Sequence, residues 1–130
     1  MPKNVRRFEF LMYAALAVVI ASFAQEWPVN PIFDYPLVTG VFLLWWAFIV
    51  FLIWQAAHRR KNWARWILFV LFILETAIMA LSSVQTLAAG TNLQLLAHAL
   101  EGVAYFFAFT GDARPWFRKG PFIDIESVFE

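Results

Sequence analysis

Four apolar segments, each close to the length that crosses a membrane as a helix, dominate this 130-residue chain. They cover about residues 8–24, 37–57, 63–87 and 93–110. Charged or proline-containing stretches separate the first three, and a short loop with Gly90, Thr91 and Asn92 separates the third from the fourth. An α-helix rises 1.5 Å per residue, so about 20 residues cross the roughly 30 Å of hydrocarbon in a bilayer. Because backbone amides in lipid must be hydrogen-bonded within their own segment, all four segments are predicted to be helices.

The composition supports a membrane protein rather than a soluble one. Hydrophobic residues make up 62% of the chain and aromatic residues 19%, whereas a soluble domain is about 45–50% apolar. A soluble domain of this size has too little interior for so many apolar side chains. The sequence therefore predicts a single all-α domain over residues 1–130, an integral membrane four-helix bundle of antiparallel hairpins with a tail over 111–130.

The basic residues predict how the chain is oriented. All ten Lys and Arg lie near the N-terminus, around the connection between the second and third segments, or after the fourth. The residues around that connection, predicted to determine the topology, are Arg59, Arg60, Lys61 and Arg65. Because cytoplasmic loops are enriched in Lys and Arg, both termini are predicted to be cytoplasmic, in a multi-pass protein of the bacterial inner (plasma) membrane.

Several tryptophans stand at informative positions. Trp54, Trp63 and Trp66 flank the basic connection, where an aromatic belt is expected. Trp116 and Phe117, between basic residues in the tail, are predicted to anchor it at the headgroups, in a stretch that its prolines keep out of regular helix. Trp45 and Trp46 differ from these, because they lie in the middle of the second apolar segment.

Two carboxylates lie at membrane depth. Glu75 is ten residues past Arg65, which is about 15 Å along a helix and near the bilayer midplane. Glu101 is eight residues past Leu93, about 12 Å along the fourth segment. If the third and fourth helices form a hairpin, the two carboxyl groups are at similar heights.

Each of these two helices carries a polar stripe. The stripes, with spacing i, i+4, i+7 and i+11, are Gln94, His98, Glu101 and Tyr105 on the fourth helix and Glu75, Met79, Ser82 and Thr86 on the third. Residues at that spacing share one helix face. A central acid costs roughly 2.5–3.5 kcal/mol to insert, judged from values for Asp, so such residues indicate a functional site by default.

Four interpretations of these residues stay open. Glu75 and Glu101, with His98 and Tyr105 on the same face, would share a proton or bind a cation. Alternatively, Glu75, His98 and Glu101 would bind a metal, in a reversed relative of the Glu-x-x-His pattern of helical di-metal sites. In the third interpretation, His98 of two copies would ligate haem. In the fourth, which the sequence favours, these side chains hydrogen-bond helix to helix.

The sequence from Arg60 to Trp66, together with Trp116-Phe117-Arg118, resembles small four-helix bacterial inner-membrane proteins of uncharacterised function. The resemblance covers the third and fourth helices and implies no activity. Small multidrug exporters fit less well, because their acid lies in the first helix, where this chain has none at depth. Fluoride channels carry glycine- and asparagine-rich motifs that this sequence lacks.

The remaining features limit the function classes. No serine–histidine–acid set or phosphate-binding loop is present, so the chain is not expected to be an enzyme. The absence of cysteine excludes disulfides and thiolate metal sites, and no cofactor is predicted, with metal and haem left open. The expected partners are the lipid bilayer and other membrane proteins or further copies of the chain, not nucleic acid.

The sequence favours a non-enzymatic accessory or interaction subunit, and the alternative is a homo-oligomeric proton-coupled transporter or ion channel.

Overall fold

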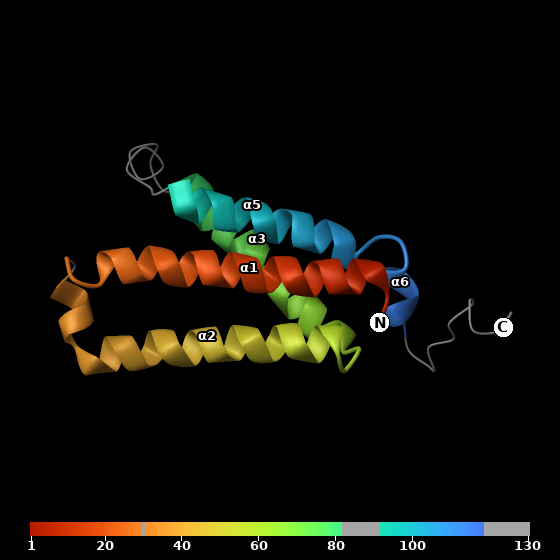
Figure 1. Cartoon of the computed structure of the whole chain (residues 1–130), viewed down its shortest axis with the longest axis horizontal. Coiled ribbons are helices and arrows are strands. Elements are labelled where there is room, and N and C mark those ends of the chain that lie inside the picture. The colour runs from red at the N-terminus through yellow and green to blue at the C-terminus, as the bar shows by residue number, and fades with distance from the viewer. Residues whose placement is uncertain (30, 82–91, 119–130) are drawn as a thin grey trace, which may run out of the picture.

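The computed structural model of the chain, which describes residues 1–29, 31–81 and 92–118, is all-α (Figure 1). The all-α prediction and the presence of four main helices are thereby confirmed. In chain order the described elements are α1 (Lys3–Glu26), the 3₁₀ helix η1 (Pro31–Asp34), α2 (Pro36–Ala57), α3 (Asn62–Leu81), α5 (Asn92–Ala108) and α6 (Ala113–Trp116). The predicted continuation of the third helix to residue 87, the turn after it and the end of the tail lie outside the described residues.

Helices α1, α2 and α3 are long and apolar enough to cross a membrane. Helix α5 is shorter, with 17 residues, and at 1.5 Å per residue it spans about 25 Å. The sequence placed this helix at about residues 93–110, and the structure ends it two residues earlier, at Ala108. The chain leaves the helix after Ala108 and turns at Gly111, which has a left-handed φ of 59°.

The first helix begins at Lys3, five residues before its predicted start at residue 8. The reason is a contact with the other end of the chain, which the local sequence does not show. The Asp112 carboxylate accepts hydrogen bonds from the backbone N–H groups of Lys3 and Asn4, at 3.1 and 3.0 Å. Asp112 thus satisfies two of the free N–H groups at the start of the helix, as an N-cap residue would.

Helix α1 is central in the arrangement and lies between α2 and α5 in Figure 1, with α3 crossing behind it. It runs antiparallel to both α2 and α5, since its N-terminus meets the end of α5 and a short connection leads into α2. As a result the N-terminus, the α2–α3 connection and α6 lie together at one end of the molecule. We call this the basic end, because it gathers the three basic parts of the chain.

The most extensive backbone contact of α5 is with α1 and not with α3. Ala97, Ala104 and Ala108 of α5 are buried, and their small side chains allow close approach of a neighbouring helix. By contrast, α3 contacts α5 through large rings, and Phe69 and Phe72 both lie against Tyr105. The closest antiparallel pair is therefore α1 with α5, where the sequence suggested α3 with the fourth helix.

Arg65 has a structural role at the basic end. Its side chain is 8% exposed, and Nη1 donates to the carbonyl oxygen of Ala108 at 2.9 Å. The guanidinium carbon lies 4.2 Å from the ring centre of Phe109 and 4.3 Å from that of Phe117. Phe117 is buried, so its predicted role as a headgroup anchor is wrong: it packs against the cation of Arg65 instead.

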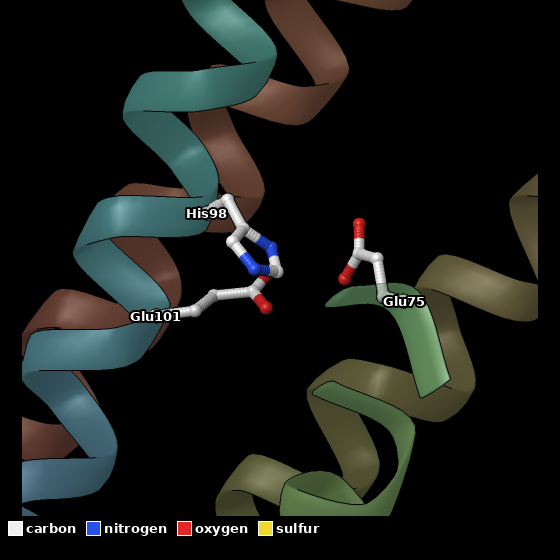
Figure 2. Close-up of side chains that lie close together, drawn as sticks. All are labelled: Glu75, His98 and Glu101. Carbon is white, nitrogen blue, oxygen red and sulfur yellow. The ribbon is translucent and has the colours of Figure 1, made fainter. Parts of the chain in front are cut away.

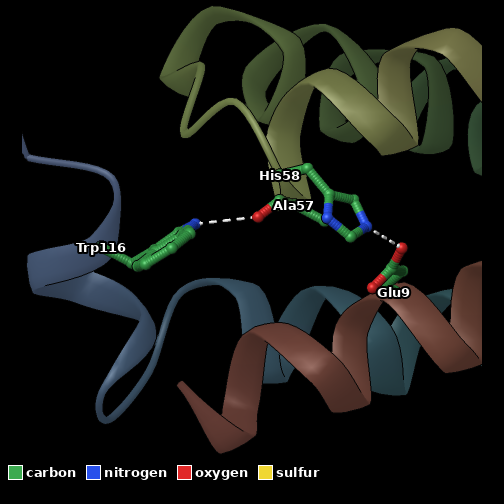
Figure 3. Close-up of polar contacts among 4 residues, drawn as sticks. All are labelled: Glu9, Ala57, His58 and Trp116. Atoms are coloured by element: carbon green, nitrogen blue, oxygen red, sulfur yellow. Dashed lines mark hydrogen bonds and ion pairs between the residues drawn. The ribbon is translucent and has the colours of Figure 1, made fainter. Parts of the chain in front are cut away.

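The short helix α6 also differs from the predicted non-helical tail. Pro115 lies inside its single turn, where the missing N–H costs little. Trp116 Nε1 donates to the carbonyl oxygen of Ala57 at 3.1 Å (Figure 3), and Arg60 Nε donates to the Trp116 carbonyl at 2.8 Å. The segment after α5 is therefore joined by hydrogen bonds to the α2–α3 connection at the basic end.

Replacing Arg65 by leucine is expected to lower the free energy of unfolding by about 1–3 kcal/mol. The change leaves the buried Ala108 carbonyl without its donor and removes the cation from between two rings. Thermal unfolding of the detergent-purified protein, followed by circular dichroism, measures the effect. Arg6→Leu, at an exposed position of α1, is the matched control, and equal melting temperatures for the two variants would contradict the prediction.

Candidate functional site

Glu75 of α3 and His98 and Glu101 of α5 converge on one space between the two helices (Figure 2). One possible ligand atom from each of the three side chains lies within 4.8 Å of the other two. The sequence left open whether the two carboxylates face each other. The structure places them face to face, with the imidazole beside them.

The backbone of α5 explains this arrangement. His98 and Glu101 are three residues apart, so they stand on the same face in successive turns. The ring of Phe72 from α3 stacks on the His98 ring, with 4.5 Å between centres and 19° between planes. The Phe72 ring also packs against the α5 backbone at Gly102, where a Cβ would lie 3.6 Å from the ring, in ordinary van der Waals contact. The two helices are thereby held a ring's width apart at the level of the carboxylates.

Thr76 determines which nitrogen of His98 carries the proton. Its Oγ1 donates to the Phe72 carbonyl at 2.8 Å, and the same oxygen is 2.8 Å from His98 Nε2. A hydroxyl has one proton to donate, so Nε2–H must be the donor to Thr76. In a neutral imidazole, Nδ1 then carries the lone pair. That nitrogen is buried and has no hydrogen-bond partner among the described residues.

Tyr105, the fourth predicted site residue, lies one turn of α5 beyond Glu101. It is buried, and its hydroxyl donates to the carbonyl oxygen of Leu68 at 2.9 Å. This bond ties α5 to α3 directly below the carboxylates. Of the rest of the predicted stripes, Gln94 is exposed, and Ser82 and Thr86 lie outside the described residues.

A cavity of about 410 Å³ adjoins the carboxylates. All four long helices line it, and Glu75, Glu101 and Tyr105 supply its polar groups. The other walls are apolar and include Trp45 and Trp46 of α2. Among the described residues that line the cavity, none is Lys or Arg. Its volume lies in the range of about 300–1,000 Å³ that is usual for small-molecule sites.

Sequence reasoning missed two parts of this site. Thr76 was not singled out, although a threonine four residues after Phe72 often bonds back to the carbonyl of that turn. The contribution of α1, through Met12, Leu16 and Val19, carried no signal because apolar residues in an apolar helix look alike. The mid-helix position of Trp45 and Trp46 was a signal, since both now prove to line the cavity.

The basic residues predicted to determine topology lie away from the site. Arg59, Arg60 and Lys61 belong to the α2–α3 connection at the basic end, and Arg65 binds the end of α5. A second carboxylate–histidine pair is found at the basic end as well. There His58 Nε2 lies 2.6 Å from Glu9 Oε1 (Figure 3), which joins α1 to the end of α2.

Comparisons with protein families, curated proteins and solved structures gave no match to this chain. The resemblance to small four-helix inner-membrane proteins therefore stays a prediction.

Tyr105→Phe is expected to lower the free energy of unfolding by about 0.5–1.5 kcal/mol, because the buried hydrogen bond from the Tyr105 hydroxyl to the Leu68 carbonyl is lost. Thermal unfolding in detergent measures the change. Tyr35→Phe removes a hydroxyl from a residue that is 65% exposed and is expected to leave the melting temperature unchanged. A Tyr105→Phe protein as stable as the wild type would show that this hydrogen bond does not hold α5 to α3.

Proposed function

We propose that this chain is a multi-pass protein of the bacterial inner membrane that handles a cation at the Glu75–His98–Glu101 site, as a homo-oligomeric transporter or channel. A proton is the simplest such cation. The observation that carries the proposal is the convergence of these three side chains beside a cavity lined by all four long helices.

The depth of the site supports this function. Glu75 and Glu101 both lie well inside their helices rather than at the ends. Inserting an acid at that depth in a membrane costs free energy, so such residues indicate a function. Two carboxylates a few ångströms apart repel each other when both are ionised, which favours a shared proton or a bound cation. No basic residue among the described cavity-lining residues neutralises them.

The orientation that we propose has both termini in the cytoplasm. The basic end gathers the N-terminus, the α2–α3 connection and α6, and the basic side of a membrane protein is the cytoplasmic side. The opposite end carries η1 with Asp34. Under this orientation, the Glu75–His98–Glu101 site lies between the two faces, where a cation crossing the membrane would pass.

The small size of the chain favours an assembly. The cavity beside the carboxylates has a volume of about 410 Å³, and a continuous pathway through the membrane would need walls from more than four helices. Helix α2 offers a surface for a second copy, because most of its large apolar side chains are exposed. They include Leu37, Val41, Leu43, Leu44, Trp45, Phe48 and Phe51.

The same exposed face of α2 favours a second candidate function, that of an accessory or interaction subunit. An unrelated membrane protein would pack on this face as readily as a second copy of the chain, since both offer apolar helices. Purification in mild detergent separates the candidates. A homo-oligomer supports the transporter or channel, and a complex with unrelated subunits supports the accessory subunit.

The topology can be tested directly because the chain has no cysteine. In intact spheroplasts, a membrane-impermeant maleimide is expected to label the Asp34→Cys variant and to leave Lys61→Cys unlabelled. Both positions are exposed, so accessibility reports the side of the membrane. Permeabilised cells, in which both should react, provide the control, and labelling of Lys61→Cys from outside would reverse the proposed orientation.

Purified protein in liposomes is expected to carry protons down an imposed potential. The double variant Glu75→Gln/Glu101→Gln is expected to lower the initial rate to that of protein-free liposomes, because amides cannot exchange a proton at neutral pH. A pH-sensitive dye inside the liposomes measures the flux. Asp34→Asn, which removes a carboxylate from η1 outside the site, is the matched control, and undiminished flux in the double variant would refute proton handling by these residues.

A further inference from the structure

The lone pair of His98 Nδ1 is the least explained feature of the site. A buried nitrogen acceptor normally has a hydrogen-bond partner, and this one has none among the described residues. The ring is nevertheless fixed in orientation. Thr76 holds Nε2–H from one side, and Phe72 stacks on the face of the ring.

This arrangement is the one that a metal-binding histidine requires. Such a histidine usually donates its second N–H to an oxygen of the protein, which sets the tautomer and aims the lone pair at the ion. Here the chain from the Phe72 carbonyl through Thr76 Oγ1 to Nε2–H performs that role. The His98 ring belongs to the same cluster as the two carboxylates (Figure 2), and Nδ1 is the ring nitrogen that is left without a hydrogen-bond partner among the described residues.

From these contacts we propose that Glu75, Glu101 and His98 Nδ1 together bind one divalent ion of a first-row transition metal. The inference rests on the proposed cation-handling site and names a second kind of cation, besides the proton, that the same side chains would hold. Charge supports a divalent ion, because two carboxylates and one M²⁺ sum to zero. A neutral cluster removes the cost of keeping two unpaired acids in an apolar environment.

The ligand set indicates the kind of metal. Imidazole nitrogen suits zinc, iron, copper and nickel, whereas carboxylate oxygen is also taken by manganese and magnesium. A mixed set of one nitrogen and two oxygens, without thiolate, is typical of zinc and its neighbours in the first row. Atoms bound to one such ion at about 2.1 Å lie roughly 3–4 Å apart. The three ligand atoms, which lie within 4.8 Å of one another, would therefore draw closer together when the ion binds.

The three ligands leave at least one coordination position open, as in metal sites that act on a substrate. Glu75 and Glu101 both line the cavity, so the open position faces that space. Water or a small oxygen ligand would complete the coordination there. The cavity thus gives the ion a way in and a place for a second ligand.

The test uses Co²⁺, whose visible d–d absorption reports the ligands around it, on the full-length protein in mild detergent. The wild type is expected to bind one equivalent of Co²⁺, with a visible band that Zn²⁺ abolishes by displacement. His98→Gln and Glu101→Gln are each expected to remove the band. Thr76→Val keeps all three ligands but frees the imidazole, and it is expected to weaken binding by about 10–100-fold.

The chain supplies its own matched control at the basic end. Glu9 and His58 form the other carboxylate–histidine pair, and that pair lies where an adventitious ion would bind a half-exposed histidine. The variants His58→Gln and Glu9→Gln are expected to leave the Co²⁺ band and its affinity unchanged. Loss of the band in these variants, with retention in His98→Gln, would overturn the proposal, as would a wild type that binds no Co²⁺.

The metal titration and the liposome assay test the two proposals separately, so one proposal can be rejected while the other is supported. A wild type that carries protons but binds no Co²⁺ overturns the metal site and leaves proton handling in place. A wild type that binds Co²⁺ through Glu101 and His98 but carries no protons supports the metal site and rejects proton transport. Circular dichroism of each variant confirms that helix content is retained.

Discussion

The close contact between α1 and α5 is the constraint on which the rest of this structure depends. Alanines along α5 let the two backbones approach, and Asp112 fixes the register by binding the first N–H groups of α1. Once α1 occupies that side of α5, helix α3 has to pack elsewhere on it. It does so through Phe69 and Phe72 rather than through small residues, so the α3 backbone stands farther away.

That wider spacing creates the candidate site. Rings hold α3 and α5 apart at the level of Phe72, and the space between them is filled by Glu75, His98 and Glu101 and continues into the cavity. The same ring that sets the spacing also stacks on the imidazole and offers its carbonyl to Thr76. Phe72 therefore affects both the packing and the site. Its ring spaces α3 from α5, and its carbonyl accepts the Thr76 proton, so that Thr76 in turn accepts a hydrogen bond from His98.

The basic end shows that residues which orient a chain in a membrane also stabilise its fold. The positive charge of Arg65 satisfies a carbonyl at the end of α5 and is covered by two aromatic rings. Arg60 and Trp116 bond the tail to the α2–α3 connection. The same end holds most of the buried apolar core, including Val5, Phe8, Ala57 and Ala113. Hydrogen bonds, cation–π contacts and apolar packing therefore act together there, whereas the cavity lies nearer the middle of the molecule.

The sequence by itself determined the helices and the candidate site residues, because helix formation in apolar segments and the cost of intramembrane charge are local properties. Glu75, His98, Glu101 and Tyr105 could be selected by depth and spacing alone. Only the tertiary structure decided that α1 is the close neighbour of α5, that Phe117 is buried and that Thr76 sets the histidine tautomer. These outcomes depend on which helices pack together. The spacing of residues predicts which of them share a helix face, but it does not predict which helix packs against that face.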